Sequence, residues 1–299
     1  MCALCYMNGL VLDLDPVLVR LGPLQIRWYG VIFVATLLAG YWVWRRQMLR
    51  GGHPAALAGR FLIWGTIATL AGARLGHCLF YEPERFLNDP ISILFFWQGG
   101  LASHGATVGL ILALFLFARR NRLPVLEMMD RFAMSAAIGS PGIRLGNFLN
   151  SEVVGRETSV PWAVRFMHYD QGAVARHPSQ LYEFALGLLV LLILYLADRW
   201  AGKEQRPLGL MTGLFLAVYF AGRFIVECFK EFQTPWGLGW GMTMGQIMSI
   251  LPFLAGVGLL AWVHRTRCRP RSAQHLPQRE PAKQARRPRQ CPLSKDETW

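Results

Sequence analysis

Charged residues are scarce in this chain, and their scarcity argues against an ordinary soluble domain. Asp, Glu, Lys and Arg make up 16% of its 299 residues, whereas a soluble globular protein carries about 25%. Hydrophobic residues make up 53% of the chain, and its mean hydropathy is +0.29. Several apolar runs are long enough to cross the roughly 30 Å of hydrocarbon in a bilayer. The composition therefore predicts a polytopic membrane protein.

Acidic residues are the scarcer charged class, with 18 Asp and Glu against 31 Lys and Arg, which gives a formal net charge of +13. Such an excess could indicate a nucleic-acid partner. Much of it, however, lies in the last 35 residues and in short loops between apolar runs. Basic residues gather in this way on the cytoplasmic flanks of membrane helices. We therefore expect no nucleic-acid partner.

Metal-site cysteine spacing is absent as well. Cys2 and Cys5 are separated by two residues, but no second pair or histidine follows them at the spacing of a zinc site. We expect neither a metal site nor a cysteine nucleophile in this protein. The six cysteines are Cys2, Cys5, Cys78, Cys228, Cys268 and Cys291.

Seven apolar segments are candidate transmembrane helices, so the expected fold is an all-α membrane protein with seven transmembrane helices. Some of them are short and contain Gly or polar residues, which is tolerated where a helix faces protein or a wet cavity. The expected spans are residues 29–44, 61–80, 101–118, 132–149, 179–197, 208–226 and 243–263.

Basic residues between these spans predict the orientation. The loops and the C-terminal tail on one side carry 21 of the Lys and Arg residues, and the segments on the other side carry seven. Because cytoplasmic loops are enriched in Lys and Arg, we expect the N-terminus outside. The chain then divides into an external segment, 1–28, a transmembrane catalytic domain, 29–264, and a basic, disordered cytoplasmic tail, 265–299.

Two external segments, 81–100 and 151–178, are long enough to be more than turns. They carry aromatic side chains of the kind that favour the membrane–water interface. We expect them to form a small external cap or to lie along the membrane surface. These aromatic residues are Trp97, Trp162, Phe166 and Tyr169.

An arginine and two asparagines near the end of one span point to a ligand. At the centre of a membrane helix an arginine such as Arg144 costs about 2.5–3.5 kcal/mol on insertion scales. Arg74 and Arg223 also lie inside spans, and few acidic residues accompany them. This surplus of positive charge indicates an anionic ligand. A phospholipid phosphate would suit these arginines, because the planar guanidinium group can donate two parallel hydrogen bonds to it.

Structural pairing is the alternative for these arginines. Arg223 and Glu227 are four residues apart and would share a helix face, so they could simply form an ion pair. Arg144 has no acidic residue within one turn, and Asn147 lies one turn away on the same face. The alternative is therefore weaker for Arg144.

His104 and the segment 176–183 are further candidates. Glycines around His104 let a ligand approach closely, and histidine can take a proton near neutral pH. A hydrogen-bonded core histidine is the simpler alternative. The segment 176–183 begins a span and is either an ordinary helix start or a gate beside the site. It contains His177, Gln180, Tyr182 and Glu183.

These segments together resemble the prolipoprotein diacylglyceryl transferase family, from about residue 16 to residue 263. Order and spacing fit throughout, and several motifs in register are far more specific than any one alone. The resemblance rests on Arg27–Gly30, His104–Gly105, Arg144–Arg156, Arg176–Glu183, Gly222–Glu227 and Thr243–Ile247.

The resemblance implies an enzyme of the bacterial inner membrane with its site facing the periplasm. Such an enzyme moves the diacylglyceryl group of phosphatidylglycerol to the lipobox cysteine of a preprolipoprotein signal peptide. The products are a thioether-linked lipid and glycerol 1-phosphate. No cofactor is implied, and the partners are phosphatidylglycerol, preprolipoproteins and membrane lipids.

The resemblance also implies roles for individual residues. Arg144 and Arg223, with Asn147, would bind the phosphate and stabilise its growing charge. The substrate thiol has a reference pKa near 8.5, so His104 or the field of the arginines would have to favour the thiolate. The implied catalytic residues are thus His104, Arg144 and Arg223. Phospholipid binding is implied for Arg144, Asn147, Arg223, Tyr29, Gly155 and Glu227, with support from Asn150, Arg156, His177, Gln180, Tyr182 and Glu183.

A few positions depart from the family pattern. We expect these changes to affect the fit of the lipid and the shape of loops more than the reaction. They are Ala106 and Ile143 where glycine is common, Val154 where the family has tryptophan, and Lys230 where it has arginine.

Two other functions fit parts of the pattern. A lipid or anion transporter, such as a flippase, would also use intramembrane arginines and glycine-broken spans. The lack of an inverted repeat and the odd number of spans argue against it. A non-catalytic lipid-binding assembly factor is the second alternative.

Overall fold

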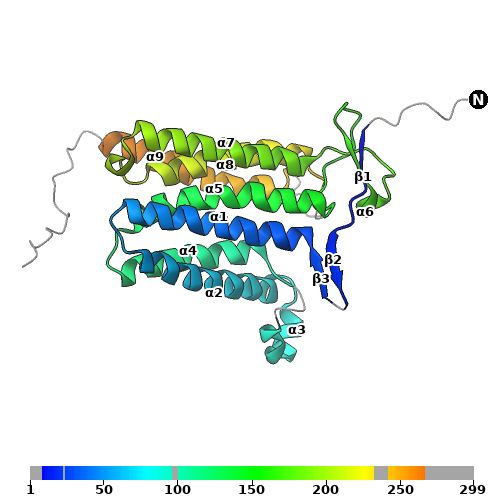
Figure 1. Ribbon diagram of the computed structural model, residues 1–299, viewed down its shortest axis with the longest axis horizontal. Helices are drawn as coiled ribbons and strands as arrows, with labels where there is room; N and C mark the ends of the chain where they lie inside the picture. Colours follow the sequence, from blue (N-terminus) through cyan, green and yellow to red (C-terminus); the bar gives the residue numbers. More distant parts are fainter. Residues whose placement is uncertain (1–8, 23, 96–99, 232–241, 267–299) are drawn as a thin grey trace, which may run out of the picture.

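Long helices that lie side by side make up most of the structure (Figure 1), a computed structural model that describes residues 9–22, 24–95, 100–231 and 242–266. Seven helices of 17 or more residues occur in these ranges. They are α1 (Trp28–Arg50), α2 (Ala55–Phe80), α4 (Ser103–Arg120), α5 (Val125–Leu149), α7 (Ser179–Trp200), α8 (Leu210–Val226) and α9 (Met244–Thr266).

Four of the long helices are long and apolar enough to cross a membrane. They are α2, α7, α9 and α8 together with the turn that follows it, Leu210–Phe229. The expectation of a mostly helical membrane fold is confirmed, and a crossing by all seven helices stays a prediction. Parts of the expected flanking segments, namely residues 1–8 and 267–299 with Cys2, Cys5, Cys268 and Cys291, lie outside the described residues, as does Trp97.

Two small sheets correct the expectation of a purely α fold. Strands β2 (Val17–Leu21) and β3 (Leu24–Arg27) form an antiparallel hairpin, and β1 (Leu10–Leu12) pairs in parallel with β4 (Val164–Phe166). The hairpin follows from β-branched residues on either side of Gly22, whose φ of +60° suits a tight turn. The remaining short elements are α3 (Pro83–Asn88), η1 (Pro90–Leu94), α6 (Met167–Asp170), η3 (Lys203–Gln205) and η4 (Glu227–Phe229).

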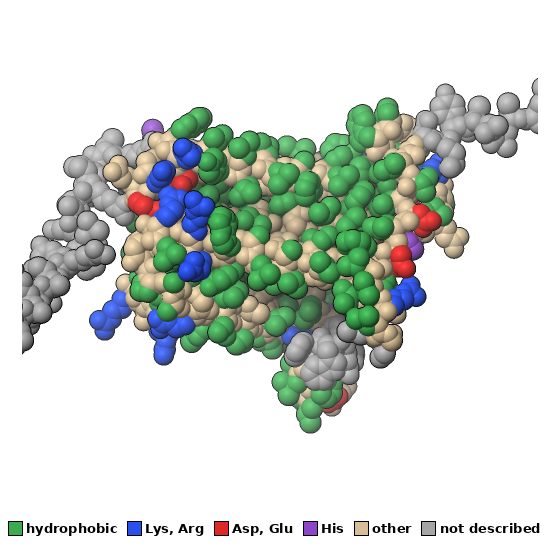
Figure 2. Space-filling model, viewed as in Figure 1, with side chains coloured by type: hydrophobic (Ala, Val, Ile, Leu, Met, Phe, Trp, Pro, Cys, Tyr) green, Lys and Arg blue, Asp and Glu red, His purple; other side chains and the backbone are tan. Residues whose placement is uncertain are grey.

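Several helices continue past the apolar spans that the sequence suggested. Helix α1 runs to Arg50, α4 runs to Arg120, and α5 begins at Val125. Arginines assigned to loops therefore lie on helical turns, as Arg46 and Arg119 do, because arginine is a good helix former whose long side chain can reach water. Figure 2 shows Lys and Arg gathered at the helix ends that lie away from β1 and α6, beside a broad hydrophobic surface.

Helix α5, which carries Arg144, has a central place in the packing. It contacts α1, α4, α7 and α8. Its internal Pro141 packs against Gly187 of α7, where a Cβ atom would lie 2.5 Å from the proline Cδ. The helix is therefore fixed by neighbours on several sides, and so is the site at its C-terminal end.

Residues 151–178 and strand β1 form what we call the loop layer, which lies across the ends of α5 and α7 (Figure 1). Its small core is made of Val154, Val164 and Phe166, which pack against Leu12 and Phe148. Isolated bridges tie Val164 to Arg176 and Gly155 to Lys230. Whether this layer is the expected periplasmic cap stays a prediction.

Glycines bring α2 and α4 into close contact. Gly72 and Gly76 of α2 face Gly105 and Gly109 of α4, so that a Cβ atom at Gly76 would lie 2.9 Å from the Cα atom of Gly105. Both helices thus carry a pair of glycines four residues apart, the arrangement that lets membrane helices approach each other closely.

We expect Gly109→Ile to lower the thermal unfolding midpoint of the protein in detergent. The new side chain would meet the backbone of α2 at Ala68 and Gly72, and overpacking of this kind costs about 1–3 kcal/mol. Gly258→Ile in α9 is the matched control, because no heavy atom lies within 4 Å of the Cβ position there. Equal midpoints for the two variants would contradict the packing described.

Candidate functional site

The side chain of Glu183 is almost completely buried and lies among three cations. Its Oε2 atom is 2.5 Å from Nε of Arg144 and 3.6 Å from Nη1 of Arg223, and its Oε1 atom is 2.5 Å from Nζ of Lys230. Lys230 also reaches Oε2 of Glu227 at 3.1 Å. These five residues, from α5, α7, α8 and the segment that follows α8, are called here the Glu183 cluster.

This arrangement corrects two expectations about the arginines. Arg144 does have an acidic partner, but the partner comes from α7 and was invisible to a search along its own helix. The simple ion pair of Arg223 with Glu227, raised as the alternative, does not form: Arg223 lies near Glu183, and Glu227 pairs with Lys230. The amide of Glu227 still bonds to the carbonyl of Arg223, but a 3₁₀ turn begins at Glu227 and brings Lys230 beside its carboxylate.

Positive charge remains after these pairs are counted. The Glu183 cluster contains three cations and two carboxylates, which leaves one positive charge. The side chains of Arg144 and Arg223 are 16% and 23% exposed, whereas Glu183 is 1% exposed and Lys230 6%. The arginines thus lie nearer to the surface than the pair beneath them, and both can reach an anionic ligand.

Asn147 connects Arg144 to the turn after α5. Its Oδ1 accepts a long 3.4 Å hydrogen bond from Nη1 of Arg144, and its Nδ2 donates to Oε2 of Glu152 at 3.2 Å. Asn150 donates to the other oxygen of Glu152, also at 3.2 Å. Glu152 was not singled out by the sequence analysis, although an acidic residue just after two asparagines at a span end was a usable signal.

The start of α7 holds the turn that contains Glu152. Gln180 donates to the carbonyl of Glu152 at 2.8 Å, and Ser179 donates to the carbonyl of Val153 at 3.1 Å. Val153 has a φ of +56°, which is strained for a β-branched residue. Gln180 therefore fixes the backbone of this turn and does not pair with a charge, and its supporting role at the site stays a prediction.

Gly155 and Arg156 position the backbone of Lys230. The amide of Gly155 donates to the carbonyl of His177 at 3.1 Å, and a Cβ atom here would lie 2.7 Å from the carbonyl oxygen of Phe229. Nε of Arg156 donates to the carbonyl of Lys230 at 2.8 Å. Only glycine leaves room for this close approach.

His177 and Tyr182 lie together at the edge of the loop layer. Nδ1 of His177 is 3.1 Å from the Tyr182 hydroxyl, which accepts a hydrogen bond from Nε1 of Trp162 at 2.8 Å. Burial lowers the pKa of His177 below its ordinary value, which favours the neutral ring. In the part of the chain that the structure describes, their contacts support the loop layer and include none of the cations of the Glu183 cluster.

Arg176 is another buried cation to which the sequence analysis gave no role of its own. It contacts Asp170 at 2.8 Å and Glu231 at 3.0 Å, and Glu231 also accepts from the Tyr169 hydroxyl. Burial alone would lower the pKa of Arg176, but these two carboxylates raise it above its ordinary value. Arg176 thereby ties the loop layer to the segment just after Lys230.

The remaining sequence candidates divide into near and distant residues. Tyr29, in the first turn of α1, packs on Gly146, where a Cβ atom would lie 2.7 Å from the tyrosine ring. The Tyr29 ring therefore contacts α5 within one helical turn of Arg144 and Asn147. His104 is exposed in the first turn of α4 and, within the described residues, forms no hydrogen bond or ion pair with the Glu183 cluster.

Arg74 is not part of the surplus charge near Glu183. Its guanidinium donates to the carbonyls of Ser92 at 2.7 Å, Ile93 at 2.9 Å and Gly100 at 3.2 Å. These bonds hold η1 and the segment before α4 against α2. Arg74, which the sequence counted among the intramembrane arginines without a role at the site, is thus compensated by backbone oxygens.

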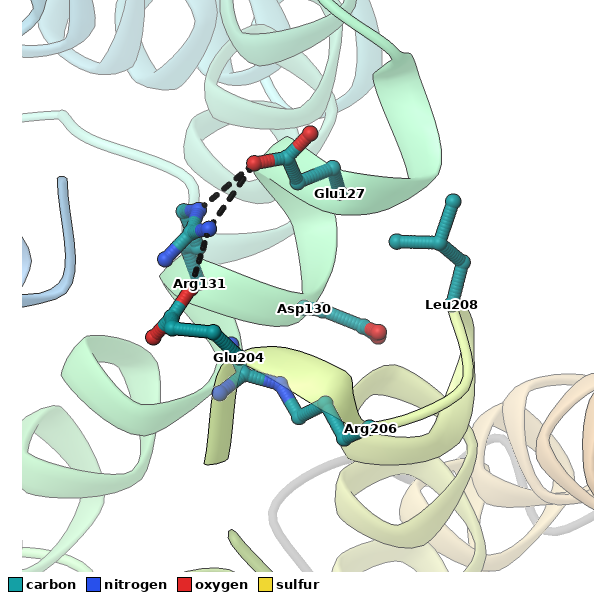
Figure 3. Close-up of a pocket in the computed structure, with 6 residues that line it drawn as sticks. All are labelled: Glu127, Asp130, Arg131, Glu204, Arg206 and Leu208. Atoms are coloured by element: carbon teal, nitrogen blue, oxygen red, sulfur yellow. Dashed lines mark hydrogen bonds and ion pairs between the residues drawn. The ribbon is translucent and has the colours of Figure 1, made fainter. Parts of the chain in front are cut away.

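A second charged cluster lies at the other end of α5, about 20 Å from Arg144 by helix rise. Figure 3 shows Arg131 between Glu127 and Glu204, at 2.8 and 2.7 Å. Asp130 accepts bonds from the amides of Gly209 and Thr212 and so caps the start of α8. The cavity between these residues has a volume of about 20 Å³, enough for one water molecule. The role of this second cluster is therefore structural, since it connects α5 to η3 and to the start of α8.

The fold and the Glu183 cluster define a helical membrane protein with a cation-rich site between its helices. A family model described as prolipoprotein diacylglyceryl transferase matches residues 16–262. The chain belongs to this family and is a transferase, so the resemblance seen in the sequence is confirmed, and nothing favours the transporter alternative.

Similar curated proteins are named phosphatidylglycerol–prolipoprotein diacylglyceryl transferase. The protein of Tolumonas auensis is 41% identical, over 82% of this chain and 94% of its own length. The protein of Rhodospirillum rubrum is 40% identical, over 85% of this chain and 94% of its own length. The protein of Gluconacetobacter diazotrophicus is 40% identical, over 89% of this chain and 96% of its own length.

We expect Glu183→Gln to destabilise the protein by about 3–5 kcal/mol, because removal of one partner leaves buried cations without compensation. Thermal unfolding of the purified protein in detergent measures the effect. Glu157→Gln, at an exposed position of the loop layer, is the matched control. A Glu183→Gln midpoint equal to that of the control would show that the carboxylate does not hold these helices together.

Proposed function

We propose that this protein transfers the diacylglyceryl group of phosphatidylglycerol to the lipobox cysteine thiol of preprolipoproteins. The names of its relatives support both substrates. The observation that carries the proposal is the convergence of Arg144 and Arg223 on a single carboxylate, with one positive charge left over. A lipid phosphate at these guanidinium groups would receive several charge-assisted hydrogen bonds.

The reaction forms a carbon–sulfur bond and breaks a carbon–oxygen bond. The thiolate attacks the glycerol carbon of the diacylglyceryl group that carries the phosphate ester. The electron pair of the broken bond leaves on the phosphate oxygen, and glycerol 1-phosphate is released. Negative charge therefore grows on the phosphate, where Arg144 and Arg223 stabilise it in a site of low dielectric. The chemistry itself needs no cofactor.

A base must take the proton of the thiol, since a thiol with a pKa near 8.5 is mostly protonated at neutral pH. We assign this role to His104. Its side chain is exposed at the start of α4, next to Gly105, whose packing against Gly72 and Gly76 of α2 fixes this end of the helix. The field of the arginines is the second means of favouring the thiolate.

We further propose that all seven long helices cross the bacterial inner membrane, with the N-terminus in the periplasm and the C-terminus in the cytoplasm. The Glu183 cluster and the loop layer then lie at the periplasmic side. The gathering of Lys and Arg at the opposite helix ends (Figure 2) supports this orientation.

Purified protein in detergent, given phosphatidylglycerol and a lipobox peptide, tests the function. We expect the peptide mass to increase by one diacylglyceryl group, and we expect Arg144→Ala to reduce the rate at least about 100-fold. Arg45→Ala, at an exposed position near the end of α1, is the control and keeps wild-type activity. No mass increase with the wild-type protein would refute the proposed function.

His104→Gln tests the assignment of the base. We expect this variant to bind phosphatidylglycerol normally and to lose transfer activity, because glutamine can donate hydrogen bonds but cannot take the thiol proton near neutral pH. Lipid binding and peptide mass are measured on the same preparation. Turnover close to that of the wild type would remove His104 from the mechanism.

A further inference from the structure

Lys230 is a buried cation that the family resemblance marked only as a departure. It is 5% exposed, and lysine is almost never buried without a partner. Its Nζ atom lies 2.5 Å from Oε1 of Glu183 and 3.1 Å from Oε2 of Glu227. The bridge to Gly155 and the hydrogen bond from Arg156 fix its backbone. The ammonium group is therefore held in place from both ends.

The two oxygens of Glu183 are divided between Lys230 and the arginines. Lys230 takes Oε1, while Arg144 and Arg223 approach Oε2. Neither arginine forms a bidentate ion pair with Glu183, which is the geometry that an arginine and an otherwise free carboxylate favour. Arg144 uses Nε for this contact, and Arg223 is 3.6 Å away. Both guanidinium groups thus keep donors for a phosphate.

Lys230 also decides the charge of the site. With it, the Glu183 cluster carries one positive charge, and without it two arginines would face two carboxylates and the sum would be zero. A unit charge in a partly buried site with an effective dielectric of about 20 changes the affinity for an anion by about tenfold or more. The ammonium itself lies beneath the arginines, since its side chain is only 6% exposed.

We propose that Lys230 is a positioning residue that determines the preference of this site for an anionic phospholipid. It neutralises Glu183, keeps both oxygens of that carboxylate from capturing one arginine, and so leaves Arg144 and Arg223 available to the lipid phosphate. This inference rests on the proposed function. It goes further by assigning headgroup selection to a residue that does not touch the lipid.

Lipid binding to purified protein in detergent, measured by native mass spectrometry, tests this role. The probes are phosphatidylglycerol and a diacylglycerol with the same two acyl chains and no charge. We expect Lys230→Met to weaken phosphatidylglycerol binding at least about tenfold and diacylglycerol binding less than threefold. Lys230→Arg keeps the charge and is expected to retain the wild-type preference. A purely structural defect would weaken the binding of both lipids equally.

A double variant covers the case in which Lys230→Met does not fold. Lys230→Met with Glu227→Gln removes one charge of each sign and restores the net positive charge, so it should recover the part of the preference for phosphatidylglycerol that depends on charge. Any of three results would overturn the proposal. Lys230→Met could keep the wild-type preference, it could lose affinity for both lipids equally, or the folded double variant could fail to recover the preference. Transfer by the wild-type protein is assayed separately, and its failure would refute the proposed function without deciding the binding result.

Discussion

The buried carboxylate of Glu183 is the feature on which the rest of the site depends. A carboxylate removed from water is stable only when opposite charges and hydrogen bonds replace its hydration. Arg144, Arg223 and Lys230 supply those charges from three different parts of the chain. Satisfying one buried charge therefore fixes α5, α7, α8 and the segment after η4 relative to one another, together with the strained turn at Val153 that α7 holds.

Two clusters built from the same residue types have different roles because their charge balance and access differ. Around Arg131 the carboxylates of Glu127 and Glu204 compensate the guanidinium, and the cavity holds only about one water molecule by its volume of about 20 Å³. Around Glu183 cations exceed carboxylates, and the arginines are partly exposed. The first arrangement leaves little room for a ligand, whereas the second leaves guanidinium donors that, in the proposed reaction, face the charge developing on the phosphate.

Much of the fold and part of the site could be predicted from the sequence, and the rest depended on contacts between distant segments. Long apolar runs indicate helices directly, so the helices were found and only their basic ends were misplaced. Gly155 was singled out only by the family resemblance, and the structure shows why a glycine is needed there, while its part in lipid binding stays a prediction. The partner of Arg144 could not be found along the same helix, because Glu183 comes from α7. The sequence shows only that Lys230 replaces the family's arginine. Its contacts with Glu183 and Glu227, which suggest its role, are visible only in the structure.

His104, the proposed base, stands on a different structural unit from the two arginines proposed to bind the phosphate. His104 begins α4, which is held to α2 by close glycine contacts, and Arg74 fixes the backbone just before it through the carbonyl of Gly100. The arginines belong to α5 and α8, which Glu183 links. Thiol and lipid would therefore be presented by two separately supported units. A substitution that only shifts the start of α4 should then slow transfer while leaving the affinity for phosphatidylglycerol intact, since the core that α4 shares with α5, with Phe117 and Met128, lies toward the other end of α4.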